Sequence, residues 1–279
     1  MSSIKCAVIG VGYLGKFHAE KYAALPQAEL VGICDIDQGR VDEIAQQLGV
    51  PAYTDYHELL GKVDAVSIAV PTAWHYPIAK TFLTHNTHVL LEKPITPSLQ
   101  DADDLVTISE NCRQILQIGH LERFNPVLGA VVPMLQKPQW IEAVRTAPYK
   151  PRGTDISVIL DLMIHDIEII QRLVAAEITN IQATGAVMVS DKIDVANARL
   201  QFANGCVANL TASRVSFNAE RQLRILQQDA FFSLDMQHKK LGIQRKGMIQ
   251  SEERNYEQND ALLAQITAFL HSVATGDKP

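Results

Sequence analysis

The sequence predicts an α/β protein that begins with a doubly wound parallel sheet and continues into an α+β domain with a largely antiparallel, open-faced sheet. Three observations support this prediction. A glycine-rich turn follows the first apolar run, strand-like and helix-like segments alternate over the first 120 residues, and a hairpin pattern follows further along the chain. We therefore expect two domains, at residues 1–122 and 123–279.

The glycine-rich turn joins the apolar run 5–9 to a segment that is compatible with a helix, and it reads Gly10-Val11-Gly12-Tyr13-Leu14-Gly15. Each glycine has a role in the dinucleotide-binding form of this turn. Gly10 permits the tight turn, Gly12 lets the backbone approach a pyrophosphate, and Gly15 lets the helix pack closely on the strand. An ordinary strand-to-helix turn is the alternative, because the G-x-G-x-x-G motif alone is weak.

An acidic residue supports the dinucleotide interpretation. Asp35 ends the second apolar run, 28–34, and follows Gly15 by 20 residues, where a carboxylate accepts hydrogen bonds from the ribose hydroxyls of an adenosine. A carboxylate there repels the 2′-phosphate of NADP, so NAD is favoured, although Arg40 leaves room for some use of NADP. Asp37 is expected to cap the helix 38–48.

The alternation over the first 120 residues predicts a Rossmann sheet with helices on both faces. Ligands bind beyond the carboxyl ends of the strands of such a sheet, so the turns at Gly10, Asp35, Pro71 and Glu92 should form the cofactor site. The expected strands and helices are 5–9, 14–25, 28–34, 40–48, 65–70, 74–84, 88–91, 99–111 and 115–118.

After residue 122 the pattern changes to helices near 126–136 and 157–175, a strand at 140–146 and further alternating strands. A hairpin of 196–202 and 206–212 is expected around Asn204-Gly205, a pair that suits a type I′ turn. Further strands are expected at 222–227, 231–236 and 241–245. The open face of this sheet is expected to meet a second subunit and give a homodimer or homotetramer.

Composition excludes several classes of function. The net charge is −6 and there is no basic block that would follow a nucleic-acid backbone. Without a signal-peptide pattern or an apolar run long enough to span a bilayer, the protein is expected to be soluble and cytoplasmic. The four cysteines are expected to be core residues in a reducing compartment. The nine histidines show no spacing that predicts a metal site.

Two groups of residues are candidates for the chemistry. Glu92-Lys93-Pro94 follows a buried strand at the expected cofactor edge, and the proline fixes the backbone beside the lysine, in cis geometry if that isomer is adopted. Asp161 and His165, four residues apart, share one face of the predicted helix, so His165 is a candidate general base. The nearby acids Asp166 and Glu168 are expected to face solvent or to cap the helix.

These motifs, in this order and spacing, resemble the Gfo/Idh/MocA oxidoreductase family over nearly the whole chain. The resemblance implies that Lys93, Asp161 and His165 line the pocket over the nicotinamide, with Lys93 hydrogen-bonding the reacting hydroxyl and His165 taking its proton. It also implies cofactor contacts from Pro71, Thr72 and His75. N-capping of the next helix is the alternative for Thr72.

Within the family, the segments 119–126 and 160–166 resemble the nucleotide-sugar branch. This resemblance implies oxidation of the 3-hydroxyl of UDP-N-acetylglucosamine for lipid A or surface polysaccharide synthesis, followed by an aminotransferase. Substrate contacts are expected from His120, Arg123, Asn125 and Arg152, with Lys150 as a further candidate near the diphosphate. Capping of the helix at Pro126 is the alternative for His120 and Asn125.

Two other functions remain open from the sequence alone. One is a dehydrogenase of free polyols or monosaccharides, of the inositol or glucose type, and the other is an NAD-binding sugar sensor without catalysis. Family members usually continue with another helix after the position of Pro279, so the C-terminus is expected to be truncated.

Overall fold

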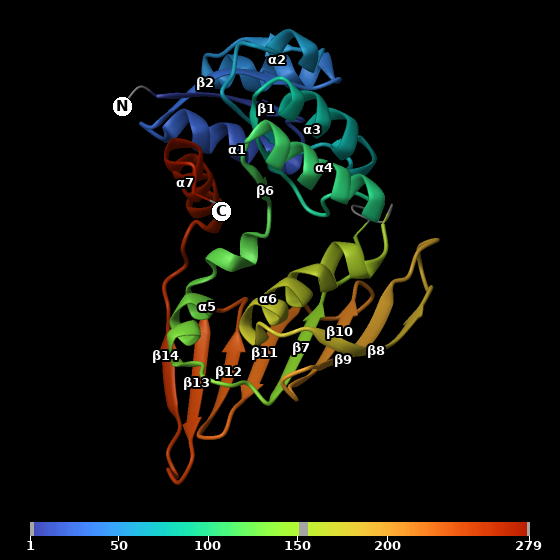
Figure 1. The fold of residues 1–279 in the computed structure, drawn as a ribbon, viewed down its shortest axis with the longest axis vertical. Helices are drawn as coiled ribbons and strands as arrows, with labels where there is room; N and C mark the ends of the chain where they lie inside the picture. Colours follow the sequence, from blue (N-terminus) through green and yellow to red (C-terminus); the bar gives the residue numbers. More distant parts are fainter. Residues whose placement is uncertain (1–2, 151–155, 278–279) are drawn as a thin grey trace. The chain divides into compact units, whose positions relative to one another are not determined.

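The computed structural model describes residues 3–150 and 156–277, and the chain forms two compact units (Figure 1). The first unit contains residues 1–119 and 260–279, and the second contains residues 120–259. The division near residue 120 lies close to the expected boundary. The expected second domain, however, included the C-terminal helix α7 (Ala261–Thr275), which packs with the first unit instead.

The first unit is built on a six-stranded sheet in the order β3-β2-β1-β4-β5-β6, in which every neighbouring pair is parallel. This is the doubly wound sheet that the alternation of strands and helices predicts. Its central strands are apolar on both faces because helices cover both faces. The strands are β1 (Ile4–Ile9), β2 (Ala28–Cys34), β3 (Ala52–Tyr53), β4 (Ala65–Ile68), β5 (His88–Leu91) and β6 (Leu116–Ile118).

Four helices connect these strands, namely α1 (Tyr13–Ala24), α2 (Gln38–Leu48), α3 (His75–Thr84) and α4 (Leu99–Cys112). Helices α3 and α4 lie side by side, as do α1 and α7 (Figure 1). Asp37 caps α2 as expected, because its side chain accepts a hydrogen bond from the Arg40 amide at 3.1 Å.

Helix α7 joins the first unit because its apolar side chains and its polar N-terminus both find partners there. Ile266 and Phe269 are fully buried. Asp260 caps the helix by accepting from the Leu263 amide at 2.9 Å, and its carboxylate lies 2.6 Å from the ammonium of Lys21 on α1. The position of α7 in the chain did not indicate this, since a segment that returns to an earlier domain leaves no local signal.

The second unit is built on an eight-stranded sheet in the order β14-β13-β12-β11-β7-β10-β9-β8. All neighbouring pairs are antiparallel except β7 with β10, which is parallel, so the expectation of a largely antiparallel sheet is confirmed. The strands are β7 (Trp140–Thr146), β8 (Ile178–Ala186), β9 (Val195–Phe202), β10 (Val207–Ser213), β11 (Glu220–Leu226), β12 (Ala230–Asp235), β13 (Lys240–Arg245) and β14 (Glu252–Asn255).

The hairpin β9–β10 is present, but its turn differs from the expected type I′. That type needs positive φ at both central residues, whereas only Gly205 takes the left-handed conformation here, at φ +86°. The Gly205 amide donates to the Phe202 carbonyl at 2.9 Å, and the Asn204 side chain accepts from the Cys206 amide at 3.0 Å. The side-chain bond of Asn204 therefore supports a longer connection in which only the glycine is left-handed.

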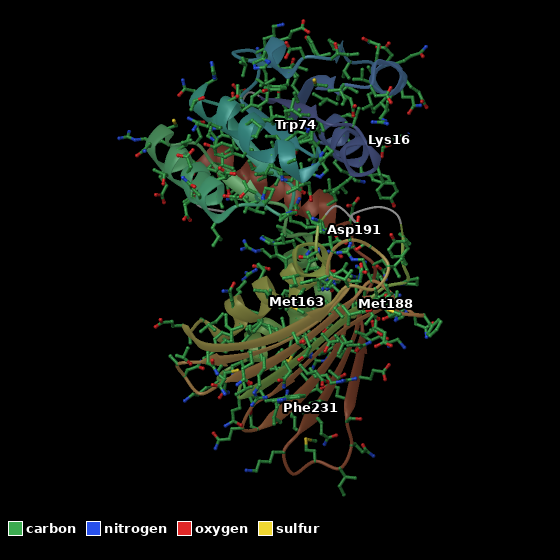
Figure 2. All side chains as sticks on the ribbon, turned by 90° about the vertical axis from the view of Figure 1, so that its right-hand side faces the viewer. Lys16, Trp74, Met163, Met188, Asp191 and Phe231 are labelled. Carbon is green, nitrogen blue, oxygen red and sulfur yellow. The ribbon has the colours of Figure 1, made fainter. Side chains whose placement is uncertain are left out.

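The helices of the second unit pack on one face of this sheet. The expected helix 126–136 is shorter, with α5 (Pro126–Val131) followed by a 3₁₀ turn (Val132–Met134). The expected helix 157–175 begins as a π-helix (Ile159–Met163) and continues as α6 (Ile164–Val174). Met163, labelled in Figure 2, is part of the apolar core between these helices and the sheet. No helix within residues 3–150 and 156–277 is long and apolar enough to cross a membrane.

A buried carboxylate organises the connection from β8 to β9, where Figure 2 labels Met188 and Asp191. Asp194 is fully buried and accepts hydrogen bonds from three successive amides, those of Met188, Val189 and Ser190, at 2.7–3.0 Å. Burial alone would raise its pKa, but these amides and the Ser190 hydroxyl hold the pKa of Asp194 well below its usual value. The connection is therefore held by an ionised carboxylate.

We expect this carboxylate to make the second unit sensitive to acid. A carboxyl group whose pKa is lower in the folded state stabilises the fold above its ordinary pKa, near 3.8, and this stabilisation is lost as the pH falls toward the folded value. Asp194→Asn should lower Tm at neutral pH, and its difference from wild type should shrink below about pH 4. Exposed Asp191→Asn is the control. A constant difference across the pH range would contradict this account.

Candidate functional site

The glycine turn of the first unit is held by close backbone packing. Gly10 has a φ of +84°, and a Cβ atom there would lie 2.7 Å from the Ala69 carbonyl oxygen. A Cβ atom on Gly15 would lie 1.8 Å from the Gly10 carbonyl oxygen, which is far inside any real contact. Nothing lies within 4 Å of a Cβ atom built on Gly12. Gly10 and Gly15 therefore close the turn, while Gly12 leaves open space at the start of α1.

Asp35 lies directly behind this turn, and its carboxylate is fixed by backbone amides. One oxygen accepts from the Val11 amide at 2.8 Å and the other accepts from the Asp37 amide at 3.0 Å. The guanidinium of Arg40 lies 3.4 Å from the same carboxylate and 3.1 Å from that of Asp37. The acid expected to hold a ribose is thus oriented by the glycine turn itself.

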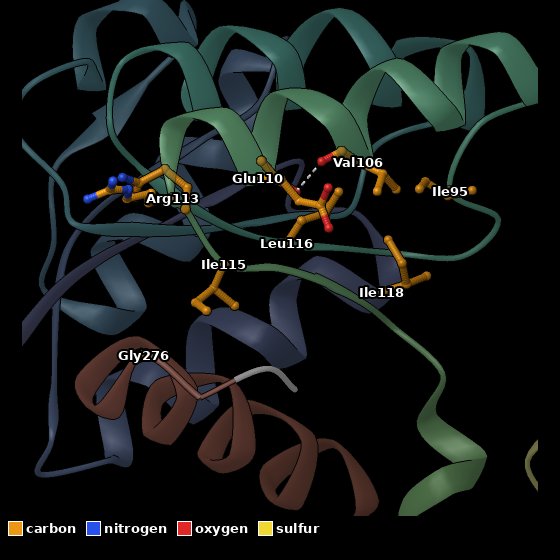
Figure 3. A pocket seen from close by; sticks show the side chains of 10 residues that line it. Ile95, Val106, Glu110, Arg113, Ile115, Leu116, Ile118 and Gly276 are labelled. Atoms are coloured by element: carbon orange, nitrogen blue, oxygen red, sulfur yellow. Dashed lines mark hydrogen bonds between the residues drawn. The ribbon is translucent and has the colours of Figure 1, made fainter.

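A cavity of about 360 Å³ opens beside the turn and is lined by Val11, Gly12, Tyr13, Lys16, Arg40, Glu43 and Ile44. It adjoins the open side of Gly12 and the first amides of α1, which suit the phosphates of a dinucleotide. A larger cavity of about 630 Å³ lies between α4, β6 and the end of α7 (Figure 3). No residue of the glycine turn lines the larger cavity, so the chemistry of the smaller one fits a dinucleotide better.

The two glycines give a prediction that separates folding from binding. Gly15→Ala forces a methyl group onto a carbonyl oxygen, and overpacking of this kind costs roughly 1–3 kcal/mol or more. Gly12→Ala places its methyl group in open space, so Tm should change little, while the affinity for NAD should fall by about tenfold or more because the backbone can no longer approach the pyrophosphate. Thermal melts and calorimetric titration with NAD measure both effects. Equal losses of Tm in the two variants would contradict the prediction.

Glu92-Lys93-Pro94 follows β5, as expected, and the Lys93–Pro94 peptide bond is cis. The Glu92 carboxylate is buried: one oxygen lies 3.3 Å from His18 Nε2, and the group packs so closely on Gly119 that a Cβ atom there would lie 2.5 Å from it. His18 Nδ1 lies 3.1 Å from the Ser67 hydroxyl. Lys93 itself is half-buried. The glutamate is therefore fixed inside the domain.

The motif Pro71-Thr72-x-x-His75 follows β4. Thr72 is buried in a 3₁₀ turn (Thr72–Trp74) whose N-cap is Pro71, and the N-cap of α3 is Trp74, so the capping alternative for Thr72 is wrong. His75 is 1% exposed, and both of its ring nitrogens lie close to backbone carbonyl oxygens. The ring of His75 therefore lies within the domain, while Pro71 is exposed.

Asp161 and His165 lie in the second unit, on either side of the change from π-helix to α-helix. Asp161 is in the π-helix (Ile159–Met163), and His165 is in the first turn of α6. Both are half-buried. A π-helical turn is rare and is frequently found at functional sites, because it is retained despite poorer hydrogen bonding. The backbone conformation of this segment is therefore a second indication of a functional site, independent of the residue types Asp161 and His165.

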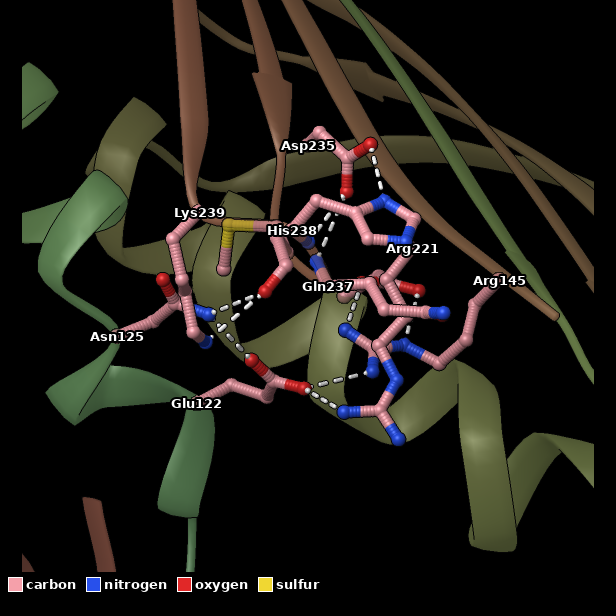
Figure 4. Close-up of polar contacts among 10 residues, drawn as sticks. Glu122, Asn125, Arg145, Arg221, Asp235, Gln237, His238 and Lys239 are labelled. Carbon is pink, nitrogen blue, oxygen red and sulfur yellow. Dashed lines mark hydrogen bonds and ion pairs between the residues drawn. The ribbon is translucent and has the colours of Figure 1, made fainter. Parts of the chain in front are cut away.

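A buried ionic cluster holds this helix to the sheet, and the sequence analysis did not identify it (Figure 4). Arg145 on β7 is 3% exposed and binds Asp166 through two bonds, Nε–Oδ2 at 3.0 Å and Nη2–Oδ1 at 2.8 Å. Its third donor, Nη1, binds Glu122 at 2.9 Å, and Arg221 Nη1 lies 3.3 Å from the same oxygen. Burial opposes the charge, but the two carboxylates raise the pKa of Arg145 above its ordinary value.

This cluster corrects the expectation that Asp166 and Glu168 face solvent or cap the helix. Asp166, which neighbours His165, is buried in the pair with Arg145. Glu168 lies 2.6 Å from Arg123 Nε. An arginine at an inward-facing position of β7, in phase with Ile141 and Ala143, is the signal that could have revealed the cluster.

The expected substrate contacts in the second unit fall into different environments. Asn125 is 3% exposed, accepts from the Val127 amide as the N-cap of α5, and donates to Glu122 and to the Met236 carbonyl. The capping alternative for Asn125 is therefore confirmed. Arg123 and His120 are partly accessible, Lys150 is exposed, and Arg152 lies outside the described residues.

Burial raises the pKa of the thiol of Cys34 to about 12 and that of Cys206 to about 11, so both stay neutral. Within residues 3–150 and 156–277, no three histidine, cysteine or acidic side chains are grouped so that they could hold a metal ion.

Comparison with known proteins identifies both units. The family described as "Oxidoreductase family, NAD-binding Rossmann fold" matches residues 4–120, and the "GFO/IDH/MocA C-terminal domain" matches residues 138–231. The chain therefore belongs to the GFO/IDH/MocA family of NAD-dependent dehydrogenases, which act on CH–OH groups of sugars. Its cofactor is NAD, in agreement with the geometry around Gly12 and Asp35.

Among its relatives, the chain is 39% identical to UDP-N-acetylglucosamine 3-dehydrogenase of Acidithiobacillus ferrooxidans, over 98% of this chain and 90% of the relative. A solved structure of that enzyme superposes with a TM-score of 0.94, covering 100% of this chain and 91% of the other. The scyllo-inositol 2-dehydrogenase (NAD(+)) of Bacillus subtilis is 28% identical over 76% of this chain and 68% of its own length. The scyllo-inositol dehydrogenase of Lactobacillus casei, solved with NAD(H) and scyllo-inositol, shares the fold with a TM-score of 0.83 at 20% identity, covering 99% of this chain and 91% of the other.

Proposed function

We propose that this protein oxidises the 3-hydroxyl of UDP-N-acetylglucosamine to a ketone with NAD as the oxidant. The observation that carries the proposal is the 39% identity to an enzyme of that name over nearly the whole chain, against 28% over a shorter stretch for a relative that acts on inositol. The motifs at Lys93 and His165, which a non-catalytic sensor would not need, support a catalytic protein.

The reaction separates a CH–OH group into a ketone, a hydride and a proton. NAD, when bound, accepts the hydride. Lys93 hydrogen-bonds the reacting oxygen and His165 accepts its proton, while Asp161 orients the histidine or the sugar. The buried pair of Arg145 with Asp166 supports this assignment, since it fixes the helical turn that carries His165.

The diphosphate of the substrate needs cations, and we assign this role to Arg123, Lys150 and Arg152. Arg123 supports the assignment best. Its Nε is fixed by Glu168 at 2.6 Å, while its side chain stays 37% exposed, so a held guanidinium remains accessible to an anion.

We also propose which reaction consumes the product. A 3-keto sugar is a substrate for transamination, so an aminotransferase in lipid A or surface polysaccharide synthesis is the expected consumer.

We further propose that the protein self-associates through the second unit. The sheet face opposite the buried core carries an apolar row across four paired strands, whose register partners are Val207, Trp140, Leu226 and Phe231. Light scattering after gel filtration tests the assembly.

Substrate profiling tests the proposed function. The protein is incubated with NAD and UDP-N-acetylglucosamine, N-acetylglucosamine or myo-inositol, with a ketone-trapping amine to draw the reaction forward, and NADH is followed by absorbance. We expect NADH from the UDP-sugar alone. Turnover of inositol without turnover of the UDP-sugar would replace the proposal with a polyol dehydrogenase, and NAD binding without turnover of any of them would favour the sensor.

A further inference from the structure

His75 connects two turns at the carboxyl edge of the first unit's sheet. It is the first residue of α3 and is almost completely buried. Its Nδ1 lies 2.8 Å from the Pro94 carbonyl oxygen, and its Nε2 lies 2.9 Å from the Val70 carbonyl oxygen. Pro94 follows β5 and Val70 follows β4, so one side chain bridges the ends of two neighbouring strands.

The chemistry of these two contacts constrains the ring. A carbonyl oxygen accepts hydrogen bonds and cannot donate, so a ring nitrogen bonds to it only when that nitrogen carries a proton. The neutral imidazole has a single N–H, and its other nitrogen would direct a lone pair at a carbonyl oxygen. Both bonds are therefore made together only when both nitrogens carry a proton, in which case each bond is charge-assisted.

The bridge acts on the residues that surround Lys93. On one side of the lysine, Pro94 is held through its carbonyl by His75. On the other side, an oxygen of the buried Glu92 carboxylate lies 3.3 Å from His18 Nε2, and the carboxylate packs against Gly119. Lys93 is thus presented from a turn that is anchored both before and after it.

The contact of His75 with Val70 links the ring to the glycine turn at residues 10–15. The Val70 side chain lies 2.7 Å from the position of a Cβ atom on Gly10, so Val70 is packed directly against the glycine turn. A displacement of Val70 would be transmitted to Gly10 because there is no free space between them. His75 therefore couples the turn that meets the pyrophosphate to the turn that carries Lys93.

We propose that His75 is a positioning residue for Lys93, and that it acts by donating a hydrogen bond from each ring nitrogen, to Pro94 and to Val70. The assignment of catalysis to Lys93 rests on the proposed function, whereas the two-donor bridge does not. The ring contacts two backbone carbonyls, so at saturating NAD its effect on kcat passes through Lys93.

Nitrogen NMR of the histidine rings tests the bridge without any substrate. The His75 signals are assigned by through-bond correlation to its own backbone amide in ¹⁵N,¹³C-labelled wild-type protein, so the test does not depend on a folded variant. We expect protons on both ring nitrogens, with slow exchange against solvent. A ring nitrogen at the frequency of an unprotonated imidazole would overturn the proposal.

A mutant cycle tests the positioning role. His75→Gln should lower kcat by roughly 10- to 100-fold, because a small misplacement of a catalytic group has effects of this size. The dissociation constant of NAD should also rise, because Val70 packs against the glycine turn, so kcat is compared at saturating NAD. His85→Gln is the matched control: His85 caps the other end of α3, where its exposed ring faces the Thr81 carbonyl at 2.7 Å, and it should leave kcat unchanged.

The decisive comparison uses Lys93→Ala. If His75 acts through Lys93, the double variant His75→Gln/Lys93→Ala is no slower than Lys93→Ala alone. Losses in kcat that multiply would overturn the positioning role. If the wild-type protein oxidises none of the sugars, the proposed function fails, while the ring nitrogens still decide whether the bridge exists.

Discussion

Replacing His165 with asparagine is expected to lower kcat for oxidation of the UDP-sugar by roughly 10²- to 10⁴-fold, the usual contribution of a positioned general base. Asparagine keeps a polar side chain of similar reach but cannot accept the proton that the hydroxyl releases. The π-helical turn and the pair of Asp166 with Arg145 do not involve the imidazole, so the backbone around residue 165 should be preserved.

The matched control for His165→Asn is Gln171→Ala, an exposed position on the same helix α6, which should retain full activity. Steady-state kinetics with saturating NAD provides the measurement, and NAD titration confirms that the cofactor still binds. A variant that keeps more than about a tenth of the wild-type kcat would remove His165 from the general-base role.

Replacing Arg145 with leucine is expected to destabilise the second unit by about 3–5 kcal/mol, because removal of one partner leaves buried charges without compensation. Two carboxylates, Glu122 and Asp166, both depend on this guanidinium. Although burial works against it, the charge of Arg145 holds the pKa of Glu122 below its ordinary value, so loss of the arginine leaves an ionised group without its main partner.

Tryptophan fluorescence can report this effect for the second unit alone. The chain has two tryptophans, Trp74 in the first unit and Trp140 on β7, so a Trp74→Phe background leaves one probe, on the strand that carries Arg145. Urea unfolding of Arg145→Leu is compared with Arg224→Ala, whose ion pair with Glu142 lies on the exposed side of the sheet and should contribute about 0–1 kcal/mol. Similar losses for both variants would show that burial of the Arg145 cluster does not matter.

The fold and the cofactor side of the site could be predicted from the sequence because their signals are local. The turn needs glycine at positions 10 and 15 for packing, as the Cβ distances confirm, and Asp35 lies at the strand end that the spacing predicts. The expected strands 222–227, 231–236 and 241–245 correspond closely to β11, β12 and β13, because alternation of buried and exposed residues is a property of each strand by itself.

The remaining features depend on contacts between segments that are distant in the sequence. The partners of Arg145 lie on the segment around residue 122 and on α6, and α7 packs with a unit that precedes it in the chain by more than 100 residues. The π-helical turn could not be predicted from the spacing of apolar residues either, because π- and α-helices bury nearly the same positions over a few residues. In each case a tertiary contact selects the structure.

The origin of the transferred hydride tests the central claim most directly. UDP-N-acetylglucosamine that carries deuterium at C3 of the sugar is incubated with the protein, NAD and a ketone trap, and the NADH formed is analysed by mass spectrometry. If the protein oxidises the 3-hydroxyl, one deuterium appears in the NADH. NADH that forms without deuterium would place the oxidised carbon elsewhere on the sugar and would contradict the proposed function.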